Sequence, residues 1–186
     1  MLFEYETERL VMKVLKPNMA GQVLDFYFRD QELFERYEPE RMAGFYTEET
    51  QKQILSFEYN CAVKGTLFRY YVYRKQVPSQ IIGTISFHHI QQGVYSNCEI
   101  GYKFSSAVHH QGYATEALAE IVDLIFWDLK LHKVTAYVQP DNTDSIRLLE
   151  RVGFFCEGIC RDHLYMRDHW QDHVRYSMIT PYYSEY

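Results

Sequence analysis

One stretch of this 186-residue chain carries most of the information about its architecture: SSAVHHQGYATEAL, from Ser105 to Leu118. It lies between a predicted strand, 97–104, and a predicted helix whose apolar residues recur at helical spacing up to Leu129. The first turn of a helix has unpaired main-chain N–H groups and the positive end of the helix dipole, which stabilise an anion without a lysine. Gly112 lets the main chain approach such a ligand closely, and the small Ala114 leaves it room. The stretch therefore predicts a phosphate-binding loop.

Strand and helix patterns continue on both sides of this loop. Strands are expected at 10–15, 67–74, 81–90, 97–104, 133–138, 154–159 and 174–179, and helices within 19–36 and at 47–64, 114–129 and 144–152. A hairpin turn is expected at 76–79, and Asp30, Thr47 and Thr50 are candidate helix N-caps. No linker composition divides the chain. The order predicts one domain, 1–186, with an α/β sheet that carries helices on its faces.

Composition and charge exclude several classes of protein. The formal net charge is −6 and no dense Lys/Arg run occurs, so the footprint of a nucleic-acid-binding protein is missing and cationic or amine-bearing partners are favoured. The first ten residues contain acids, and nowhere do eighteen apolar residues follow one another. This excludes a secretory signal and a membrane span and predicts a cytoplasmic protein. Four scattered cysteines are expected to be reduced thiols.

The segment EIGYKFSSAVHHQGYATEAL, from Glu99 to Leu118, resembles the coenzyme-A loop of the GNAT acetyltransferases. The family pattern Gln/Arg-x-x-Gly-x-Gly/Ala falls on His109, Gly112 and Ala114. The stretch GYATEA is similar to the RimJ/RimL-type branch, the ribosomal-protein N-terminal acetyltransferases and their relatives. Residues 142–154 resemble the second family motif, and residues 6–10 its usual opening. The resemblance covers most of the chain and is weaker between about 36 and 64.

This resemblance implies a GNAT fold, in which the central strands of a mostly antiparallel, twisted sheet splay apart, with acetyl-CoA as cosubstrate and no metal. The chain departs from the family at His109 and His110, where Gln/Arg and often Gly are found, so main-chain amides are expected to carry phosphate binding. It also has Leu149 where many members have a tyrosine general acid. The residues implied in coenzyme binding are Tyr102, Phe104, His109, His110, Gln111, Gly112, Tyr113, Ala114, Thr115 and Asn142.

The resemblance implies direct attack of a neutral amine on the acetyl thioester, with a general base and an acid. The candidate base is Glu99, which alternation places on one strand face with Gly101, where it would act through water. The alternative is a carboxylate that is ion-paired or solvated. The candidate acid is Ser145, because some RimJ/RimL-type enzymes have a serine there. The alternative is an N-cap or first-turn residue of its helix.

The histidines and cysteines do not follow a zinc-binding pattern. The pairs His88-His89 and His109-His110 are adjacent, and neighbouring side chains point in different directions in an extended chain. Cys156-x-x-x-Cys160 lacks a second pair at zinc-finger spacing. A metal site is therefore not expected. Three more histidines are expected in a polar loop around Trp170: His163, His169 and His173.

Three functions stay open at this stage. The first is acetylation of a protein N-terminus, as in the ribosomal-protein branch that the chain resembles. The second is acetylation of a small amine such as an aminoglycoside, a polyamine or an amino acid. The third is a non-catalytic coenzyme-A-binding module, suggested by Leu149 and the altered loop start. A closed aromatic pocket would favour a small amine, and an open acidic groove would favour a peptide. The candidates for attracting a basic substrate are Glu38, Glu40, Glu48 and Glu49, and the simpler alternative is an exposed acidic face. A homodimer is compatible with the family.

Overall fold

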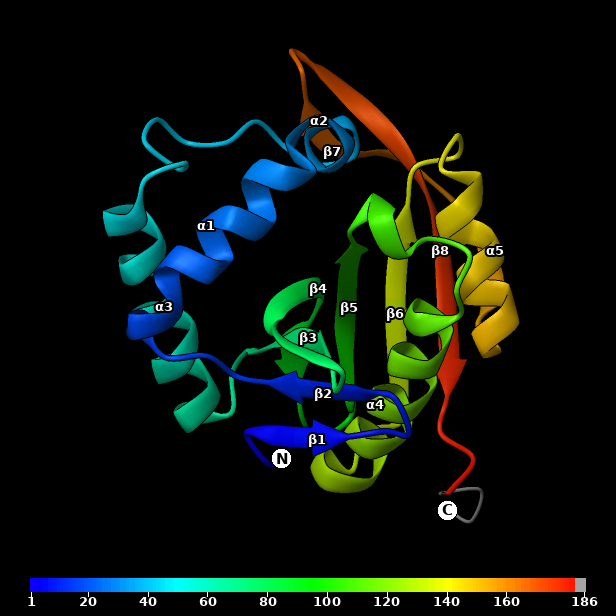
Figure 1. Ribbon diagram of the computed structural model, residues 1–186. Helices are drawn as coiled ribbons and strands as arrows, with labels where there is room; N and C mark the ends of the chain where they lie inside the picture. The colour runs from blue at the N-terminus through cyan, green and yellow to red at the C-terminus, as the bar shows by residue number, and fades with distance from the viewer. Residues whose placement is uncertain (183–186) are drawn as a thin grey trace.

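An eight-stranded mixed sheet forms the centre of the computed structural model, which describes residues 1–182 (Figure 1). The end of the expected domain, 183–186, lies outside the described residues. The strands lie in the order β1-β2-β3-β4-β5-β6-β8-β7, and neighbours are antiparallel except β5 with β6. Their bounds are β1 Glu4–Glu6, β2 Leu10–Lys13, β3 Phe68–Arg74, β4 Val77–Gln91, β5 Asn97–Phe104, β6 Lys133–Val138, β7 Phe155–Met166 and β8 His169–Ile179. The expected mixed, mostly antiparallel sheet is confirmed.

Helices cover both faces of this sheet. Strand β3 contributes to an apolar cluster on each side, because Tyr70 packs with Leu118 of α4 whereas the next residue, Tyr71, packs with Phe26 of α1 and Leu55 of α3. Each such side chain contributes about 1.5–3 kcal/mol on withdrawal from water, so the two clusters fix the helices on the sheet. The helices are α1 Ala20–Arg29, α2 Gln31–Arg36, α3 Glu48–Lys64, α4 Tyr113–Leu129 and α5 Thr143–Val152.

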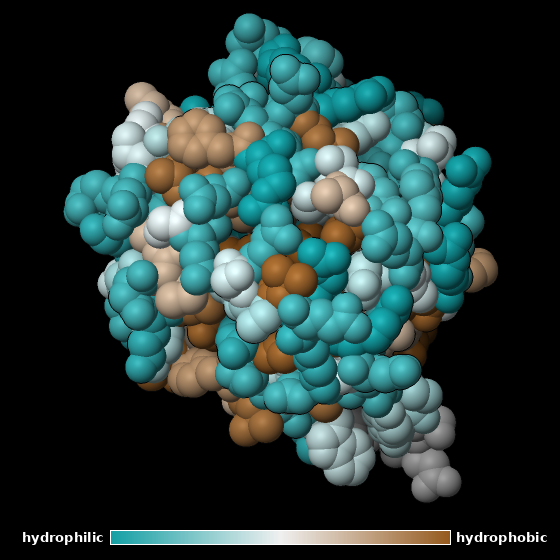
Figure 2. All heavy atoms as spheres, in the orientation of Figure 1, coloured by the Kyte–Doolittle hydropathy of each residue, from teal (hydrophilic) through white to brown (hydrophobic). Residues whose placement is uncertain are grey.

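The surface in the orientation of Figure 1 is mostly hydrophilic, with apolar side chains in small patches (Figure 2). Within residues 1–182, no helix is long and apolar enough to cross a membrane.

The two central strands splay apart. Parallel pairing joins β5 to β6 at three positions, Asn97 with Lys133, Cys98 with Val134, and Glu99 with Thr135. Beyond Glu99 strand β5 continues to Phe104 with no further pairing to β6. Main-chain N–H and C=O groups need partners, so this open edge of β5 offers them to a ligand that enters the gap. The expected splay is confirmed, and its vertex lies at Glu99.

The sequence expectation for the end of the sheet is wrong. Residues 169 and 173 are not in a polar loop but in β8, and residue 163 is in β7, because these strands form a long hairpin that turns at Arg167 and Asp168. Strand β7 is the outermost strand and is exposed along most of its length. Polar side chains are therefore tolerated on it, which hides the strand pattern in the sequence.

Local turn and cap chemistry was predicted in part. The hairpin between β3 and β4 turns at Lys75 and Gln76, one residue earlier than expected, and Pro78 lies inside β4. Thr47 is the N-cap of α3 and accepts a hydrogen bond from the Thr50 amide, as predicted. Asp30 occupies the N-cap position of α2, as predicted, but its side chain makes no capping hydrogen bond. Its carboxylate instead accepts hydrogen bonds from the amide and hydroxyl of Ser106, at 3.0 and 2.5 Å.

Candidate functional site

The predicted phosphate loop is a turn that leads into the N-terminus of α4. A short 3-10 helix, Ser106–Val108, is followed by two left-handed residues, His110 with φ +59° and Gly112 with φ +79°. Helix α4 then begins at Tyr113, and no side chain caps its N-terminus. The N–H groups of its first turn are therefore oriented toward an anion in front of the helix, together with the positive end of the dipole. These features fit a polyphosphate such as that of coenzyme A.

The side chains of the loop hold its shape. The His109 ring nitrogen Nε2 lies 3.1 Å from the carbonyl oxygen of Phe104, and Gln111 donates to the carbonyl of Ala107 at 3.0 Å. His109 is thus turned back onto the end of β5, whereas His110 is exposed. Phe104 is 7% exposed and belongs to the apolar core, so it supports the loop rather than facing a ligand.

The N-terminal segment braces this loop from outside, a role that the sequence alone did not assign. Arg9 places its Nε 2.5 Å from the carboxylate of Glu116 in the first turn of α4 and donates to the carbonyl of Gln111 at 3.1 Å. Its guanidinium lies 4.4 Å from the centre of the Tyr113 ring. Burial opposes ionisation of Glu116, but hydrogen bonds from Thr7 and Arg9 outweigh it and hold the pKa of this carboxyl below its ordinary value.

Glu99 lies at the vertex of the splay on the face opposite α4. Its neighbours Cys98 and Ile100 point into the α4 core, so alternation puts Glu99 and Gly101 on the other face, as predicted. The side chain of Glu99 is 32% exposed and contacts two imidazoles, His88 Nε2 at 3.5 Å and His89 Nδ1 at 3.1 Å. The hydrogen bond with His88 lowers the pKa of Glu99 below its ordinary value. Burial of the carboxylate acts in the opposite direction, and the hydrogen bond with His89 adds to the lowering. Glu99 is therefore a carboxylate at neutral pH.

The expectation that His88 and His89 diverge is wrong. His88 is the direct cross-strand partner of Glu99, and the register of β4 with β5 shifts just after it. His89 adopts a left-handed backbone with φ +49°, which no regular strand contains. Because of this turn, both imidazoles reach the same carboxylate.

Ser145 and Tyr102 meet across the open gap between β5 and α5. Their hydroxyl oxygens are 2.7 Å apart, and the Tyr102 hydroxyl also donates to the main-chain carbonyl of Ser145 at 3.2 Å. Burial raises the pKa of Tyr102, so its hydroxyl stays protonated. Asn142 is the N-cap of α5, with its side-chain oxygen 3.2 Å from the Ser145 amide, and Leu149 is fully buried in the core. Ser145 is thus a first-turn residue of α5, and its hydroxyl contacts the hydroxyl of Tyr102. The sequence alone did not pair these two side chains.

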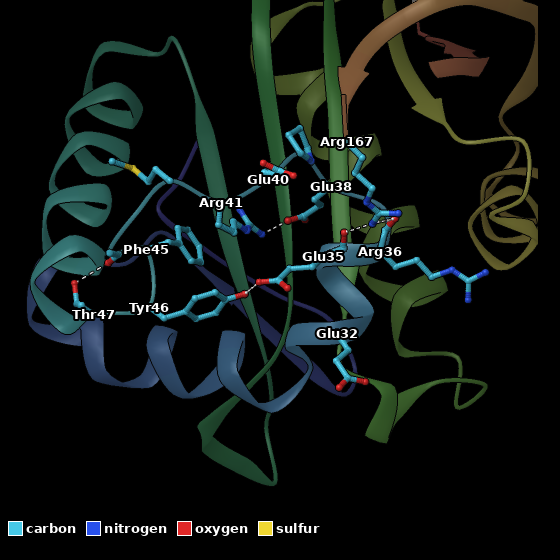
Figure 3. Close-up of a pocket in the computed structure, with 13 residues that line it drawn as sticks. Glu32, Glu35, Arg36, Glu38, Glu40, Arg41, Phe45, Tyr46, Thr47 and Arg167 are labelled. Atoms are coloured by element: carbon cyan, nitrogen blue, oxygen red, sulfur yellow. Dashed lines mark hydrogen bonds and ion pairs between the residues drawn. The ribbon is translucent and has the colours of Figure 1, made fainter. Parts of the chain in front are cut away.

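A cavity of about 890 Å³ opens between α2, the loop 37–47 and the tip of the β7–β8 hairpin (Figure 3). Arg167 at the hairpin tip donates to the main-chain carbonyls of Glu35 and Arg36, at 2.5 and 2.7 Å, and so closes one side. Tyr46 donates to Glu35 at 2.5 Å, and burial together with this contact raises the pKa of Tyr46 to about 12. The charged residues that line the cavity are Glu32, Glu35, Glu38, Glu40, Arg36, Arg41 and Arg167.

An ion pair links this cavity to the central strand. Lys103 of β5 forms a salt bridge with Glu38, which also contacts Arg41. Lys103 lies on the same face of β5 as Glu99, four residues further along. The cavity, Lys103 and Glu99 therefore lie along one face of the sheet.

A family model described as an acetyltransferase (GNAT) domain matches residues 9–155. The chain belongs to the GNAT acetyltransferase family. The match spans the bracing Arg9, the splayed strand, the loop and all of α5, so the GNAT features described above lie inside the matched region. The enzyme is an N-acetyltransferase that performs acetyl transfer.

Similar proteins include enzymes that acetylate ribosomal proteins. The chain is 29% identical to a probable N-acetyltransferase, YjcK, of Bacillus subtilis (strain 168), over 92% of this chain and 94% of that protein. It superposes on the crystal structure of the ribosomal-protein-S5-alanine acetyltransferase from Vibrio fischeri with a TM-score of 0.90 and 26% identity, covering 98% and 99% of the two chains. RimJ of Mycobacterium smegmatis, solved with CoA-disulfide, shares the GNAT fold with a TM-score of 0.84 at 24% identity, over 95% and 84% of the chains.

Replacing Arg9 by Ala should weaken acetyl-CoA binding about three- to tenfold. The loop would lose a charge-assisted hydrogen bond to Gln111, and Glu116 would place an unbalanced negative charge beside the phosphates. Isothermal titration with acetyl-CoA measures the change. Lys75→Ala is the control, because it breaks another ion pair of the N-terminal segment, with Glu6 at 2.9 Å, away from the loop. Equal affinities of Arg9→Ala and the wild type would contradict the bracing role.

Proposed function

We propose that this GNAT enzyme transfers the acetyl group of acetyl-CoA to the N-terminal amine of a polypeptide, as its ribosomal-protein-acetylating relatives do. The observation that carries the proposal is the acceptor-side cavity, which is open, about 890 Å³ in volume and lined by four glutamates and three arginines. Its aromatic lining is limited to Phe45 and Tyr46. A small amine would be held better by a closed apolar pocket, whereas a polar groove suits an extended peptide with basic side chains.

The distance between the cavity and Glu99 supports a peptide acceptor. Lys103, which contacts Glu38 in the cavity wall, lies four residues from Glu99 along β5, or about 13 Å at strand rise. An extended acceptor therefore needs about four residues to place its amine at Glu99 while its following side chains reach the cavity. A free amino acid is too short to make both contacts in this way.

Each side chain of the site has a role in this proposal. The loop amides, the α4 N-terminus and Arg9 hold the coenzyme phosphates, and the open edge of β5 binds the acetyl arm and polarises its carbonyl. Glu99 takes a proton from the attacking amine through a water molecule. Ser145 donates a hydrogen bond to the leaving sulfur, while its oxygen accepts a hydrogen bond from the hydroxyl of Tyr102. This pair replaces the tyrosine that many family members have at the position of Leu149.

Ser145→Ala and Tyr102→Phe should each lower kcat by about three- to tenfold, the effect of one hydrogen bond to the leaving group. Because the two hydroxyls act as one unit, the double variant should be no slower than Ser145→Ala alone. Single-turnover kinetics with saturating acetyl-CoA measures these rates. Tyr176→Phe is the control, since the Tyr176 hydroxyl also donates to α5 but contacts Glu150 instead of Ser145. Unchanged rates in both single variants would show that neither hydroxyl is the general acid.

The acceptor class is tested with alanine amide and a series of peptides that begin with alanine and grow from about two to about eight residues. We expect kcat/KM to rise with length up to about four or five residues and then to level off, because the chain must reach the cavity. Lysine at the fourth or fifth position should raise kcat/KM, and glutamate should lower it. Mass spectrometry locates the acetyl group. Equal kcat/KM for alanine amide and all peptides would instead identify a small-amine acetyltransferase.

A further inference from the structure

Two histidines, His88 and His89, contact the carboxylate of Glu99. A carboxylate that acts only as a general base does not need these two partners. His88 Nε2 lies 3.5 Å from one carboxylate oxygen, and His89 Nδ1 lies 3.1 Å from the other. The ligand atoms of the three residues all lie within 4.8 Å of one another. Imidazole nitrogens and a carboxylate are the donor set of many catalytic zinc sites, in which a fourth position stays open.

The backbone is distorted where the second imidazole joins. His89 has φ +49°, and a left-handed conformation of a non-glycine residue costs about 1–2 kcal/mol. In a regular strand its side chain would point to the face opposite His88. The shifted register between His88 and Gln91 turns it to the same side instead. Such strain tends to persist at functional sites, where the surrounding structure holds it.

The spacing of these atoms agrees with tetrahedral zinc coordination. Zinc bonds to nitrogen and oxygen are about 2.0–2.2 Å long, so two ligand atoms of a tetrahedral site lie about 3.3–3.6 Å apart. His88 Nε2 and His89 Nδ1 lie 3.5 and 3.1 Å from the two different oxygens of Glu99, so each imidazole is already near this spacing from the carboxylate, and the side chains would adjust to place one oxygen and both nitrogens around the ion. We propose that His88, His89 and Glu99 bind one Zn²⁺ ion, with an open fourth position.

The surroundings leave room for this ion and its open position. A small cavity of about 100 Å³ adjoins His89 and Glu99 and is also lined by Thr135, Tyr137 and Arg175. One water molecule occupies about 30 Å³, so the cavity accommodates a zinc-bound water. The cation in its wall is balanced, because Arg175 Nε lies 3.0 Å from the carboxylate of Glu157. His89 itself is 68% exposed, which gives the ion a path from solvent.

Zinc binding would switch off acetyl transfer. Coordination to Zn²⁺ withdraws electron density from the carboxylate of Glu99 and lowers its affinity for a proton, so the metal-bound enzyme has a much weaker base. This consequence rests on the proposed role of Glu99, whereas metal binding itself does not. Transfer should therefore fall as Zn²⁺ fills the site and return when a chelator removes it.

The experiment uses chelator-stripped full-length protein without acetyl-CoA. Calorimetric titration should show one Zn²⁺ per chain, and Co²⁺ in its place should give the intense visible absorption of a tetrahedral site. His88→Gln and His89→Gln should each weaken Zn²⁺ binding by at least about tenfold, since even partners that only orient a ligand contribute this much. The control is His169→Gln, which removes an exposed histidine at the start of β8 and should bind Zn²⁺ like the wild type.

The outcomes separate the metal site from the transfer mechanism. No binding by the wild type, a weak octahedral Co²⁺ spectrum, or equal affinities of the wild type and both cluster variants overturns the site. The Co²⁺ spectrum of the wild type decides the matter even if a variant fails to fold. If Zn²⁺ binds through the histidines but leaves acetyl transfer unchanged, the metal site stands and the assignment of Glu99 as base falls.

Discussion

Glu99→Gln should lower the turnover of acetyl transfer by about 10²–10⁴-fold, the usual contribution of a positioned general base. Glutamine keeps the size and the hydrogen-bonding capacity of the side chain at the vertex of the splay but cannot accept the amine proton. The affinity for acetyl-CoA should change little, because the phosphate loop lies at the far end of β5. Steady-state kinetics with a peptide acceptor and a parallel acetyl-CoA titration separate the two quantities.

The matched control is Glu120→Gln, which removes an exposed carboxylate from α4. Its turnover should equal that of the wild type. The pH profile gives a second readout. Because the pKa of Glu99 lies below its ordinary value, the base form persists to lower pH, and Glu99 should cause no loss of kcat/KM until the pH falls below about 4.5. Full turnover by Glu99→Gln would assign the base to another group.

Gly112→Ala should weaken acetyl-CoA binding by at least about tenfold. Gly112 has φ +79°, where a residue with a Cβ is strained by about 1–2 kcal/mol, and that Cβ would lie 3.4 Å from Arg9 Nη2. The loop can relieve both effects only by moving, which takes the main-chain amides away from the phosphates. A change of 1.4 kcal/mol corresponds to a factor of about ten in affinity.

Gly65→Ala provides the comparison for this substitution. Gly65 ends α3 with φ +73°, so the backbone strain is similar, but nothing lies within 4 Å of its added Cβ and it is remote from the loop. Both variants should lose about 1–2 kcal/mol of unfolding free energy in chemical denaturation. Only Gly112→Ala should lose coenzyme affinity. Equal loss of affinity in both would show that general destabilisation, rather than the loop, is measured.

Local features of the site were predictable from the sequence. The left-handed glycine, the uncapped helix start and the apolar stripe of α4 all lie within one continuous stretch around Gly112, so their pattern is visible without a fold. The C-terminal end of α5 at Gly153 was also predicted, whereas its N-cap is Asn142 and the helix begins at Thr143, one residue before the expected start. Alternation along β5 placed Glu99 and Gly101 on one face correctly.

The contacts that the sequence did not reveal are non-local or depend on irregular backbone. Arg9 and Glu116 are 107 residues apart, and Tyr102 and Ser145 are 43 apart, so the sheet order must be known before they can be paired. The convergence of His88 and His89 on one carboxylate requires the left-handed backbone at His89. Such a conformation is usually predicted from a glycine, and this position is a histidine.

The most direct test of the central claim is titration of the purified wild-type protein with acetyl-CoA. Peptides with an N-terminal alanine are then incubated with the protein and acetyl-CoA and analysed by mass spectrometry. The account predicts saturable one-site binding and the gain of one acetyl group on the peptide N-terminus. Gain of the acetyl group on small amines alone would contradict the peptide acceptor. No binding of acetyl-CoA would contradict the assignment of the Ser105–Leu118 loop as its phosphate site, and with it the mechanism built on Glu99 and Ser145.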